Sequence, residues 1–488
     1  MPERRVGVGR ITSERSVLNS FLRGEREFDT SVRVIGETTI TNPATEDELG
    51  LYRSGEARKA VIADTEMLHA FEEHGSQTVP TFLEAGPRAR LYHDPHTVKV
   101  AIVTTGGLAP GIHCTIHSIV KRHWHTYRLG AAQGRIYGVY NGFDGLCRLA
   151  ESRVKLELTP ELTEQWLDQG GSKLGLVRGE FVRGDDEPLR KMVNKITDNL
   201  RQNGINILYV IGGDGSLRVA HQIAEANPTR SIVGIPKTMD NDILWVWNSF
   251  GFDTAVEQAT RVINTLRNDA EATRRVSLIE LFGAESGFVA ANATLASGHV
   301  NAVLIPEVFN LLESSDDANT YLRAIAHWVA EWAQDPRHHP VHGVMVVAEG
   351  VGTIFQKRGW KVDGAEVTKS SFVGQLMLLV EREVAEHRGE DLAVYLNQPR
   401  HYIRAVPANS HDQIYCERLG ALAVDNALAG YTGFMISQWL SEYVLVPMAL
   451  LKDAQKSIPV NGMFWKQVVS STGQPLSPAE RSASGSHP

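Results

Sequence analysis

The chain has 488 residues, 42% of them hydrophobic and 22% charged, with a formal net charge of -8 at pH 7. This composition is typical of a globular protein. It lacks the basic character that nucleic-acid binding needs, and no run of about 18 apolar residues could span a membrane. The N-terminus has no apolar signal segment, and the three cysteines (Cys114, Cys147 and Cys416) are widely spaced. We therefore expect a reducing, cytoplasmic location rather than a disulfide framework or a zinc site built on cysteine.

Residues 1–95 are polar with sparse apolar positions, and we interpret them as an N-terminal extension. The apolar run Val98–Val103 then predicts a buried strand. The glycine-rich stretch TTGGLAPG stops this run, after which apolar residues recur at helical spacing at Ile112, Ile116 and Ile119. A strand, a glycine loop and a helix in this order are the opening of a βαβ unit.

The same pattern recurs further along the chain. Four more apolar runs end in glycine-rich or polar loops: Ile205–Ile211, Ser231–Ile235, Val276–Leu281 and Gly343–Gly350. Because helical stretches alternate with these runs, we predict an α/β fold whose mostly parallel sheets are covered by helices on both faces. In such sheets ligands bind beyond the carboxyl ends of the strands, where the polar motifs of this sequence also lie.

Two glycine loops have the chemistry of an anion site. In Thr105–Gly111 the glycines let backbone N–H groups approach an anion, and the following helix adds a favourable dipole. No Gly-Lys-Ser/Thr follows, so this is not a Walker loop, and taken alone the stretch is equally compatible with a tight turn. Gly212–Ser216 places Asp214 among glycines, where its carboxylate could hold Mg²⁺ beside phosphate-binding amides. A plain acidic turn remains the alternative there.

A third motif follows the run Ser231–Ile235 and reads PKTMDND. It sets Asp240 and Asp242 two residues apart, beside Lys237 and Thr238. A carboxylate can accept the proton of a phosphoryl acceptor hydroxyl, and the lysine offers a compact positive charge to the transferring phosphate. The alternative is a solvated loop, which seven such unusual residues make harder to sustain.

Several later residues follow or precede predicted strands: Arg275, Glu349, His401 and Arg404. The spacing His-x-x-Arg would aim two donors at one anion if it lies on a helical turn. Singly, such residues are more often surface groups or ion-pair partners.

The histidines His113, His117, His123 and His125 sit on the helix after the first glycine loop. Because no acidic residue joins them and the helix already has an apolar face, we favour packing over metal binding.

Taken together, the ordered motifs TTGGLAPG, YGVYNGFDGL, GGDGS, GIPKTMDND, GFDTA and RVSLIELFG resemble the phosphofructokinase family over about residues 80–475. Further stretches, EAGPRARLYHDP, RAVPANSHDQIYC, AGYTGF and STGQP, resemble its plant and trypanosome ATP-dependent branch, which is related to the pyrophosphate-dependent enzymes.

The resemblance implies two similar doubly wound lobes with mostly parallel sheets, an active site in the cleft between them, and a homo-oligomer, either a tetramer or a dimer. The expected parts of the chain are an extension (1–95), a nucleotide-binding lobe (96–256, resumed at about 405–445), a sugar-phosphate lobe (257–404) and a C-terminal segment (446–488) with a disordered tail from Ser477.

Residue roles follow from the resemblance position by position. The residues implied to face ATP–Mg²⁺ are Gly106, Gly107, Tyr140, Arg178, Gly213, Asp214, Gly215 and Ser216, with Asp214 as the metal ligand. The residues implied for the sugar phosphate are Thr238, Asp240, Asp242, Arg275, Phe282, Gly283, Glu349, His401 and Arg404. Asp240 matches the catalytic base, flanked by Lys237 and Thr238, and Arg275 is implied to come from a neighbouring subunit.

The choice of phosphoryl donor depends on Gly215. Pyrophosphate-dependent relatives carry Asp at this position, and that carboxylate would crowd and repel the α-phosphate of ATP, so Gly215 favours ATP. Lys237 matches both kinds of enzyme.

Three positions depart from the family pattern. Ala284 replaces an arginine that would stabilise transferring charge, Tyr395 replaces a basic residue for the 6-phosphate, and His113 replaces an asparagine. Arg400 is a candidate to compensate for the lost charge.

The sequence therefore predicts an ATP-dependent 6-phosphofructokinase that moves the γ-phosphate of ATP–Mg²⁺ to the 1-hydroxyl of fructose 6-phosphate. Two alternatives stay open. One keeps the chemistry with pyrophosphate as donor or another sugar phosphate as acceptor, and the other is a regulatory relative without turnover.

Overall fold

The computed structural model describes residues 13–45, 52–62, 64–74, 79–131, 133–176, 187–333, 335, 341–388, 392–452 and 455–484. Within it the chain forms two compact units. The first comprises residues 1–238, 243–251 and 405–456, and the second comprises residues 239–242, 252–404 and 457–488. The chain therefore passes between the units several times.

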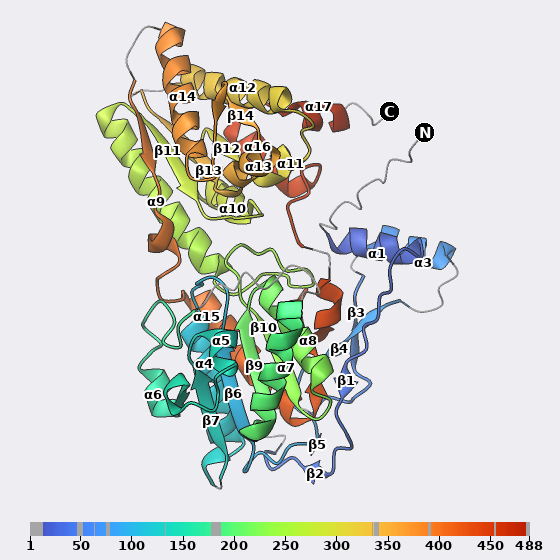
Figure 1. Cartoon of the computed structure of the whole chain (residues 1–488). Coiled ribbons are helices and arrows are strands. Elements are labelled where there is room, and N and C mark those ends of the chain that lie inside the picture. Colours follow the sequence, from blue (N-terminus) through green and yellow to red (C-terminus); the bar gives the residue numbers. More distant parts are fainter. Residues whose placement is uncertain are drawn as a thin grey trace. The chain divides into compact units, whose positions relative to one another are not determined.

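The first unit is built on one sheet, which has nine strands in the described part of the chain (Figure 1). In order across the sheet these are β3 (Arg58–Ala60), β4 (Thr81–Glu84), β19 (Glu442–Pro447), β18 (Phe434–Trp439), β10 (Ser231–Pro236), β9 (Ile207–Gly212), β6 (Lys99–Thr104), β7 (Arg135–Val139) and β8 (Lys155–Glu157). The strands from β18 to β7 run parallel, and the remaining pairs are antiparallel. The predicted parallel α/β architecture is confirmed for this unit.

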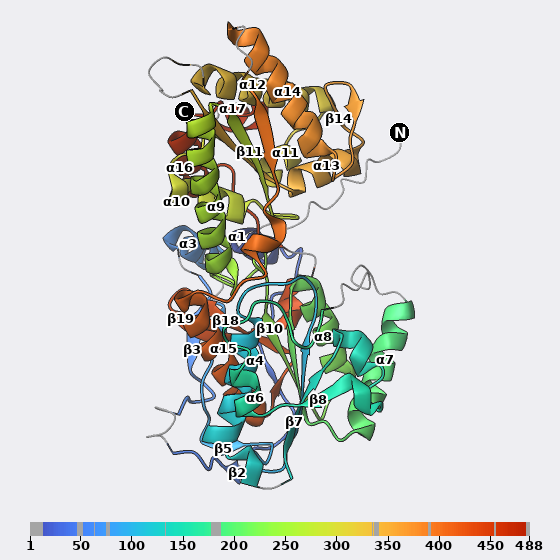
Figure 2. The same ribbon diagram turned by 90° about the vertical axis from the view of Figure 1, so that its left-hand side faces the viewer.

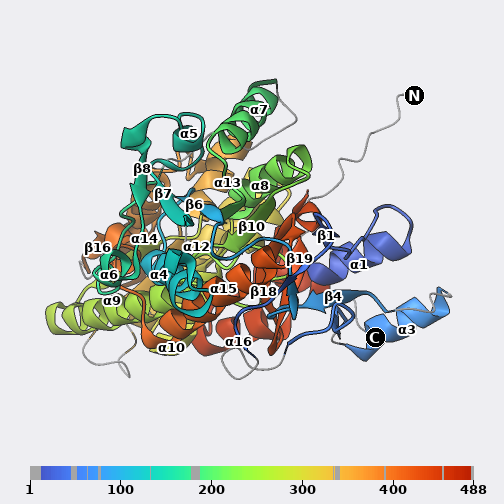
Figure 3. The same cartoon turned by 90° about the horizontal axis from the view of Figure 1, so that it is seen from below.

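Helices cover both faces of this sheet. One face carries α4 (Ile112–Lys121) and α15 (Ser410–Leu428), and the other carries α7 (Glu187–Gln202) and α8 (Asp214–Ala226), as Figure 3 shows.

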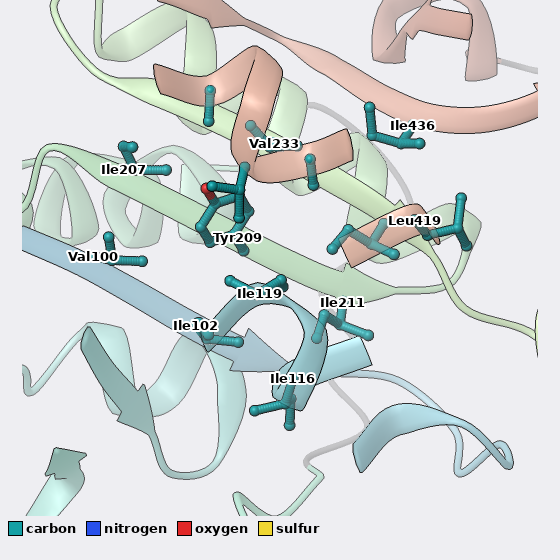
Figure 4. Close-up of a cluster of buried hydrophobic side chains, with 14 of the residues drawn as sticks. Val100, Ile102, Ile116, Ile119, Ile207, Tyr209, Ile211, Val233, Leu419 and Ile436 are labelled. Atoms are coloured by element: carbon teal, nitrogen blue, oxygen red, sulfur yellow. The ribbon is translucent and has the colours of Figure 1, made fainter. Parts of the chain in front are cut away.

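Because side chains alternate along a strand, Val100 and Ile102 of β6 pack towards α4, whereas Ala101 and Val103 join the cluster under α7 and α8. Figure 4 shows the first of these cores, in which Ile116 and Ile119 of α4 lie against the strands. The apolar face expected for this helix is thus confirmed.

Described residues within the stretch 1–95 contribute to this unit, because β3 and β4 extend its sheet beyond β19. Phe82 of β4 is fully buried in the core that also holds Trp245. The other elements of the unit are α1 (Glu14–Leu22), β1 (Arg33–Val34), β2 (Ile40–Thr41), α3 (Thr65–Glu73), β5 (Arg90–Leu91), the π-helical turn η1 (Arg122–Thr126), η2 (Leu129–Ala131), α5 (Gly142–Leu146), η3 (Ser152–Val154), α6 (Pro160–Glu164), β17 (Tyr431–Thr432) and η5 (Met448–Leu451).

The second unit has a sheet with four parallel strands in the described residues: β12 (Ala302–Leu304), β13 (Gly343–Ala348), β11 (Val276–Leu281) and β16 (Val394–Asn397). Helices α9 (Phe252–Thr273) and α10 (Phe288–Ser297) pack together on one face. Helices α12 (Ser315–Ala333) and α14 (Phe372–Arg388) pack together on the other, as Figure 2 shows. This unit is also doubly wound, so the predicted pair of similar α/β folds is confirmed.

The remaining elements of the second unit are α11 (Pro306–Asn310), α13 (Gly350–Arg358), β14 (Lys361–Val362), β15 (Ala365–Glu366), η4 (Arg400–Ile403), α16 (Met463–Thr472) and α17 (Pro478–Ser484). The last helix differs from the disordered tail expected from Ser477. Trp465 Nε1 donates a hydrogen bond of 2.5 Å to Glu480, whose other oxygen accepts the Ser477 N–H at 2.8 Å. These contacts with α16 order a segment whose composition alone suggests disorder.

Of the helices that the structure describes, none combines the length and apolar character needed to cross a bilayer.

Candidate active site

Three of the predicted motifs lie at the carboxyl ends of three neighbouring strands. TTGGLAPG follows β6, GGDGS follows β9, and PKTMDND follows β10. The register pairs Thr104 with Ile211 and Pro236 with Gly212, so the three loops leave the sheet at the same level. Helices α4 and α8 lead from β6 and β9 to opposite faces. The strand order therefore reverses here, as it does at ligand sites of open α/β sheets.

The backbone of Gly106 borders a space lined by donors. Its φ of +82° is the left-handed region that favours glycine. A Cβ built at Gly106 would lie 3.6 Å from Ser216 Oγ, 3.7 Å from Lys237 Nζ and 3.8 Å from the Gly213 nitrogen. A hydroxyl, an ammonium and a backbone N–H thus surround one spot, which suits an anion. We call Gly106, Gly213, Ser216 and Lys237 the anion cradle.

Lys237 is held at the centre of the cradle by the chain around it. Its side chain is buried, with 2% of the residue exposed. Its N–H donates to the Gly212 carbonyl oxygen at 2.9 Å, and its Nζ donates to the Gly107 carbonyl oxygen. An anion bound beside this buried ammonium would add to the compensation of its charge.

Asp214, the predicted metal ligand, begins α8 and pairs with Arg218 one turn along the helix. Arg218 donates to its two carboxylate oxygens at 3.2 and 2.8 Å. A carboxylate has about four lone-pair sites, so pairing with an arginine is compatible with holding a cation as well. Mg²⁺ in phosphoryl-transfer sites is bound by carboxylate oxygens together with the phosphates of the substrate. Asp214 offers a carboxylate beside the anion cradle, so the residues present fit this ion. The pairing with Arg218 was missed, although its i, i+4 spacing in the sequence could have indicated it.

The loop after β7 closes the other side of β6. Tyr140, predicted at the nucleotide side, donates its N–H to the Val154 carbonyl oxygen at 2.9 Å. In the same loop a Cβ at Gly142 would lie 3.0 Å from the Thr104 carbonyl oxygen, so this loop packs closely on the end of β6. Arg178, the other predicted nucleotide residue of this region, lies outside the described residues.

The segment after β10 carries the predicted catalytic residues. The Thr238 carbonyl oxygen accepts a hydrogen bond from Ser249 Oγ at 2.5 Å within the first unit. The Asp240 carbonyl oxygen accepts one from Ser286 Oγ at 2.7 Å within the second unit. Asp240 and Asp242 are both partly exposed. No sequence signal points to Ser286, which reads as an ordinary loop serine.

In the second unit, Phe282, Gly283 and Glu349 follow two paired strands. The Glu349 N–H donates to the Leu281 carbonyl oxygen, and Gly350 N–H to that of Gly283, both at 3.0 Å. A Cβ at Gly283, whose φ is +140°, would lie 2.4 Å from the Ser286 carbonyl oxygen, so this position requires glycine.

Arg404 and His401, both predicted to bind the sugar phosphate, lie at this end of the sheet. The guanidinium of Arg404 lies 4.5 Å from the centre of the Phe282 ring, and its Nη2 is 3.3 Å from His401 Nδ1. Stacking on an aromatic face fixes the direction of an arginine and leaves its edge for hydrogen bonding. The structure thus brings together Phe282, His401 and Arg404 as a candidate anion site.

Arg275 is placed elsewhere. It precedes β11, whereas Phe282 follows it, and a strand of this length separates its ends by about 20 Å. The Arg275 guanidinium lies 4.0 Å from the centre of the Tyr395 ring and its Nη1 is 3.6 Å from Asp269. Within one chain, Arg275 therefore does not join His401 and Arg404.

Two charged residues of this unit, Arg400 and Glu349, form ion pairs that the sequence did not predict. Arg400, the candidate for compensating lost charge, pairs with Glu280 at 3.3 Å, and Gln398 Nε2 donates to the same carboxylate at 2.5 Å. Burial raises the pKa of Glu280, and the charge of Arg400 opposes this. Glu349, expected to bind sugar hydroxyls, forms a 3.2 Å ion pair with Lys369. These partners are distant in sequence, so no local signal pointed to them.

Comparison with known proteins agrees with this geometry. The family model described as Phosphofructokinase matches residues 99–427. The chain belongs to the phosphofructokinase family. It is 35% identical over 416 residues to "ATP-dependent 6-phosphofructokinase" of Borreliella burgdorferi, covering 83% of this chain and 88% of that protein. It is 34% identical over 416 residues to "ATP-dependent 6-phosphofructokinase 4, chloroplastic" of Arabidopsis thaliana, covering 83% and 72%.

A solved structure supports the phosphofructokinase fold. The pyrophosphate-dependent phosphofructokinase of Marinobacter aquaeolei matches with a TM-score of 0.59 at 16% identity, over 78% of this chain and 92% of that one. At this identity the match shows the fold alone. The family resemblance predicted from the motifs is confirmed.

Proposed function

We propose that the chain is an ATP-dependent 6-phosphofructokinase, which transfers the γ-phosphoryl group of ATP to the 1-hydroxyl of fructose 6-phosphate. The observation that carries this proposal is the anion cradle, in which Lys237 Nζ, Ser216 Oγ and the Gly213 nitrogen lie within 3.8 Å of a Cβ built at Gly106. Relatives named for this activity match across four-fifths of the chain, which supports the assignment.

On the donor side, the cradle and the start of α8 hold the phosphates of ATP through backbone N–H groups, Ser216 and Lys237. Gly213 and Gly215 contribute no side chain that would repel the phosphates, and Gly107 lies beside Gly106 in the loop after β6. Tyr140 and Arg178 are the proposed contacts at the outer part of the nucleotide. Magnesium held by Asp214 would neutralise part of the phosphate charge.

On the acceptor side, Asp240 takes the proton of the 1-hydroxyl as that oxygen bonds to the γ-phosphorus. The bond from the γ-phosphorus to the bridging oxygen breaks, and ADP leaves with the electron pair. Thr238 and Asp242 flank this base. The Lys237 ammonium lies in the cradle, where it stabilises the negative charge that develops on the transferring phosphoryl group.

The sugar phosphate is oriented by groups of the second unit. Arg404, stacked on Phe282, and His401 bind the 6-phosphate, and Gly283 leaves room for the chain to turn beside it. Glu349 accepts hydrogen bonds from sugar hydroxyls. A carboxylate already paired with Lys369 still has lone pairs for this purpose.

Chain connectivity supports joint action of the two sets of groups. Lys237 and Thr238 belong to the first unit and Asp240 and Asp242 to the second, so six consecutive residues carry the donor-side cation and the proposed base. A small displacement of this segment would disturb the positioning of both the donor and the acceptor.

We further propose a homo-oligomer, a tetramer or a dimer, in which Arg275 serves the sugar-phosphate site of a neighbouring subunit. This is supported by its place at the opposite end of β11 from Phe282. We also propose that the protein works in the cytoplasm.

The test is a donor and acceptor panel with the purified chain. ATP and pyrophosphate are each supplied with fructose 6-phosphate or glucose 6-phosphate, and the products are identified by mass spectrometry. We expect fructose 1,6-bisphosphate and ADP in equal amounts from ATP and fructose 6-phosphate. Faster turnover with pyrophosphate would establish the alternative donor, and no product from any pair would support the regulatory alternative.

A further inference from the structure

His113 makes two hydrogen bonds to one backbone segment. It is the second residue of α4, directly after the first glycine loop, and the residue is 3% exposed. Its Nδ1 lies 2.8 Å from the Gln169 carbonyl oxygen, and its Nε2 lies 3.0 Å from the Lys173 nitrogen. Because a carbonyl can only accept and an N–H can only donate, Nδ1 carries the proton and Nε2 accepts.

The neutral form of the ring is therefore required. A protonated imidazole presents two donors and loses the bond from the Lys173 N–H. Burial lowers the pKa of His113 and so does the charge of Lys173, while the bond to Gln169 opposes the shift. A positive charge in the first turn of α4 would also face the positive end of the helix dipole.

The described neighbours of this ring are mostly uncharged. Its ring neighbour is Trp166, with centroids 5.8 Å apart. The small gap beside it is lined by apolar, glycine and amide groups of residues 109–112, 167, 169–171, 406 and 408, together with Cys114. Burial raises the pKa of the Cys114 thiol to about 11, so it is neutral. Of the residues that the structure describes, Lys173 is thus the charged group that acts on the ring, and it favours the neutral state.

The held segment, residues 169–175, continues to the nucleotide side of the sheet. Thr104 Oγ1, at the end of β6, donates to the Gly175 carbonyl oxygen at 2.8 Å. Asn141, next to Tyr140 at the end of β7, donates its N–H to the Leu174 carbonyl oxygen at 2.9 Å. His113 fixes one end of this segment and the ends of β6 and β7 fix the other.

We propose that His113 is a positioning residue for the nucleotide side: by holding Gln169 and Lys173, it sets residues 169–175 beside the ends of β6 and β7. This inference rests on the proposed function, because it assigns the segment to the binding of the nucleotide. His113 touches neither substrate nor reacting atoms in this account. It acts through the backbone of residues 169–175, which contacts the ends of β6 and β7.

The test compares His113→Leu, which keeps an apolar side chain of moderate size and removes both hydrogen bonds, with His117→Leu. His117 lies one turn further along the same helix and contacts Thr163 Oγ1 at 3.0 Å instead of the segment. Hydrogen exchange of the peptide spanning residues 166–176 is followed by mass spectrometry, together with steady-state kinetics for ATP and fructose 6-phosphate.

In His113→Leu, we expect exchange in this peptide to accelerate about tenfold, the effect of losing an ordinary hydrogen bond. KM for ATP should rise about tenfold, with KM for fructose 6-phosphate and kcat within about twofold. His117→Leu should change neither. If His113→Leu does not fold, His113→Gln, which can keep one of the two bonds, should show the same changes at smaller size.

Unchanged exchange in the His113 variants, or equal effects on both substrates, would overturn the proposal. Failure of the proposed function and failure of the positioning role give different experimental results. A native chain that is inactive with ATP contradicts the proposed function, and the exchange measurement then still decides whether His113 holds the segment. An active native chain whose His113 variants match it in KM contradicts the positioning role alone.

Discussion

The ammonium group of Lys237, at the end of β10, donates a hydrogen bond to the carbonyl oxygen of Gly107 in the loop after β6. These strands are not neighbours, because β9 lies between them. The bond therefore joins the first and third loops across the second, and it places a buried cation beside the glycine backbone where we propose that phosphate binds.

Replacing this lysine should damage both binding and chemistry. Lys237→Met keeps the length of the side chain and removes the charge, so we expect kcat to fall by about 10²-fold or more and KM for ATP to rise. Steady-state kinetics measure both. Lys191→Met, on the exposed side of α7, where the lysine pairs with Glu187, should leave both constants unchanged. A Lys237→Met enzyme with native kcat would remove this residue from the mechanism.

The glycine at position 106 can be tested against a glycine of similar backbone. Gly106→Ala places a methyl group 3.6 Å from Ser216 Oγ and 3.7 Å from Lys237 Nζ, inside the cradle. Gly24 has a φ of +71° with open space around it, so Gly24→Ala carries comparable backbone strain, about 1 kcal/mol, without blocking a site. We expect both variants to lose similar stability in denaturant titrations.

Only Gly106→Ala should raise KM for ATP, by about tenfold or more if the methyl group displaces one phosphate contact. Equal KM values in the two variants would show that the space beside Gly106 holds no ligand.

Arg404 provides a test on the acceptor side. Its guanidinium stacks on Phe282 at 4.5 Å and approaches His401. Arg404→Leu should raise KM for fructose 6-phosphate by about 10- to 100-fold, the range expected when a charged hydrogen bond to phosphate is lost, with little change in KM for ATP. Arg382→Leu is the matched control, because Arg382 pairs with Asp363 on the surface. A rise confined to ATP would move Arg404 to the other substrate.

Glu307 predicts a pH dependence of stability. Glu307 is buried, with 6% of the residue exposed. It accepts the N–H groups of Gly287 and Ile458 at 3.0 Å, yet burial outweighs these bonds and raises its pKa from 4.5 to about 7. Between those values the folded protein keeps a proton that the unfolded chain has released. The Glu307 contribution to stability is therefore complete below about pH 4.5 and is lost as pH rises towards 7.

The Glu307→Gln variant cannot titrate, so its free energy of unfolding should vary less with pH between 4.5 and 7, by up to ~3 kcal/mol over that interval. Denaturant unfolding at closely spaced pH values measures this difference. Glu366→Gln, with an exposed side chain, should keep the native pH profile. A native profile in Glu307→Gln would mean that this carboxyl stays ionised in the fold.

Much of this architecture could be predicted because its signals are local. The runs that became β6, β9, β10, β11 and β13 are continuous and apolar since parallel strands are buried on both faces. Glycines such as Gly106 and Gly283 marked loops because their backbone angles or their close neighbours exclude other residues. The cradle was foreseeable for the same reason, since each of its members follows a recognisable strand.

The remaining features depend on partners far away in the sequence. Strands β3 and β4 are too short for a clear alternating pattern, and they join the sheet because Phe82 packs in a core with Trp245. Gln398 and Glu280 are 118 residues apart, and no local pattern links them. Helix α17 forms where Glu480 meets Trp465, so its order comes from tertiary contacts rather than from composition.

The central claim concerns phosphoryl transfer to fructose 6-phosphate with Asp240 as the base. We would follow a mixture of ATP–Mg²⁺, fructose 6-phosphate and the native chain by ³¹P NMR, beside the same mixture with Asp240→Asn. With the native chain, we expect new fructose 1,6-bisphosphate and ADP signals that grow together. We expect a rate slower by about 10²- to 10⁴-fold for the variant. Equal rates with Asp240→Asn, or a native chain that leaves both substrates unchanged, would contradict this claim.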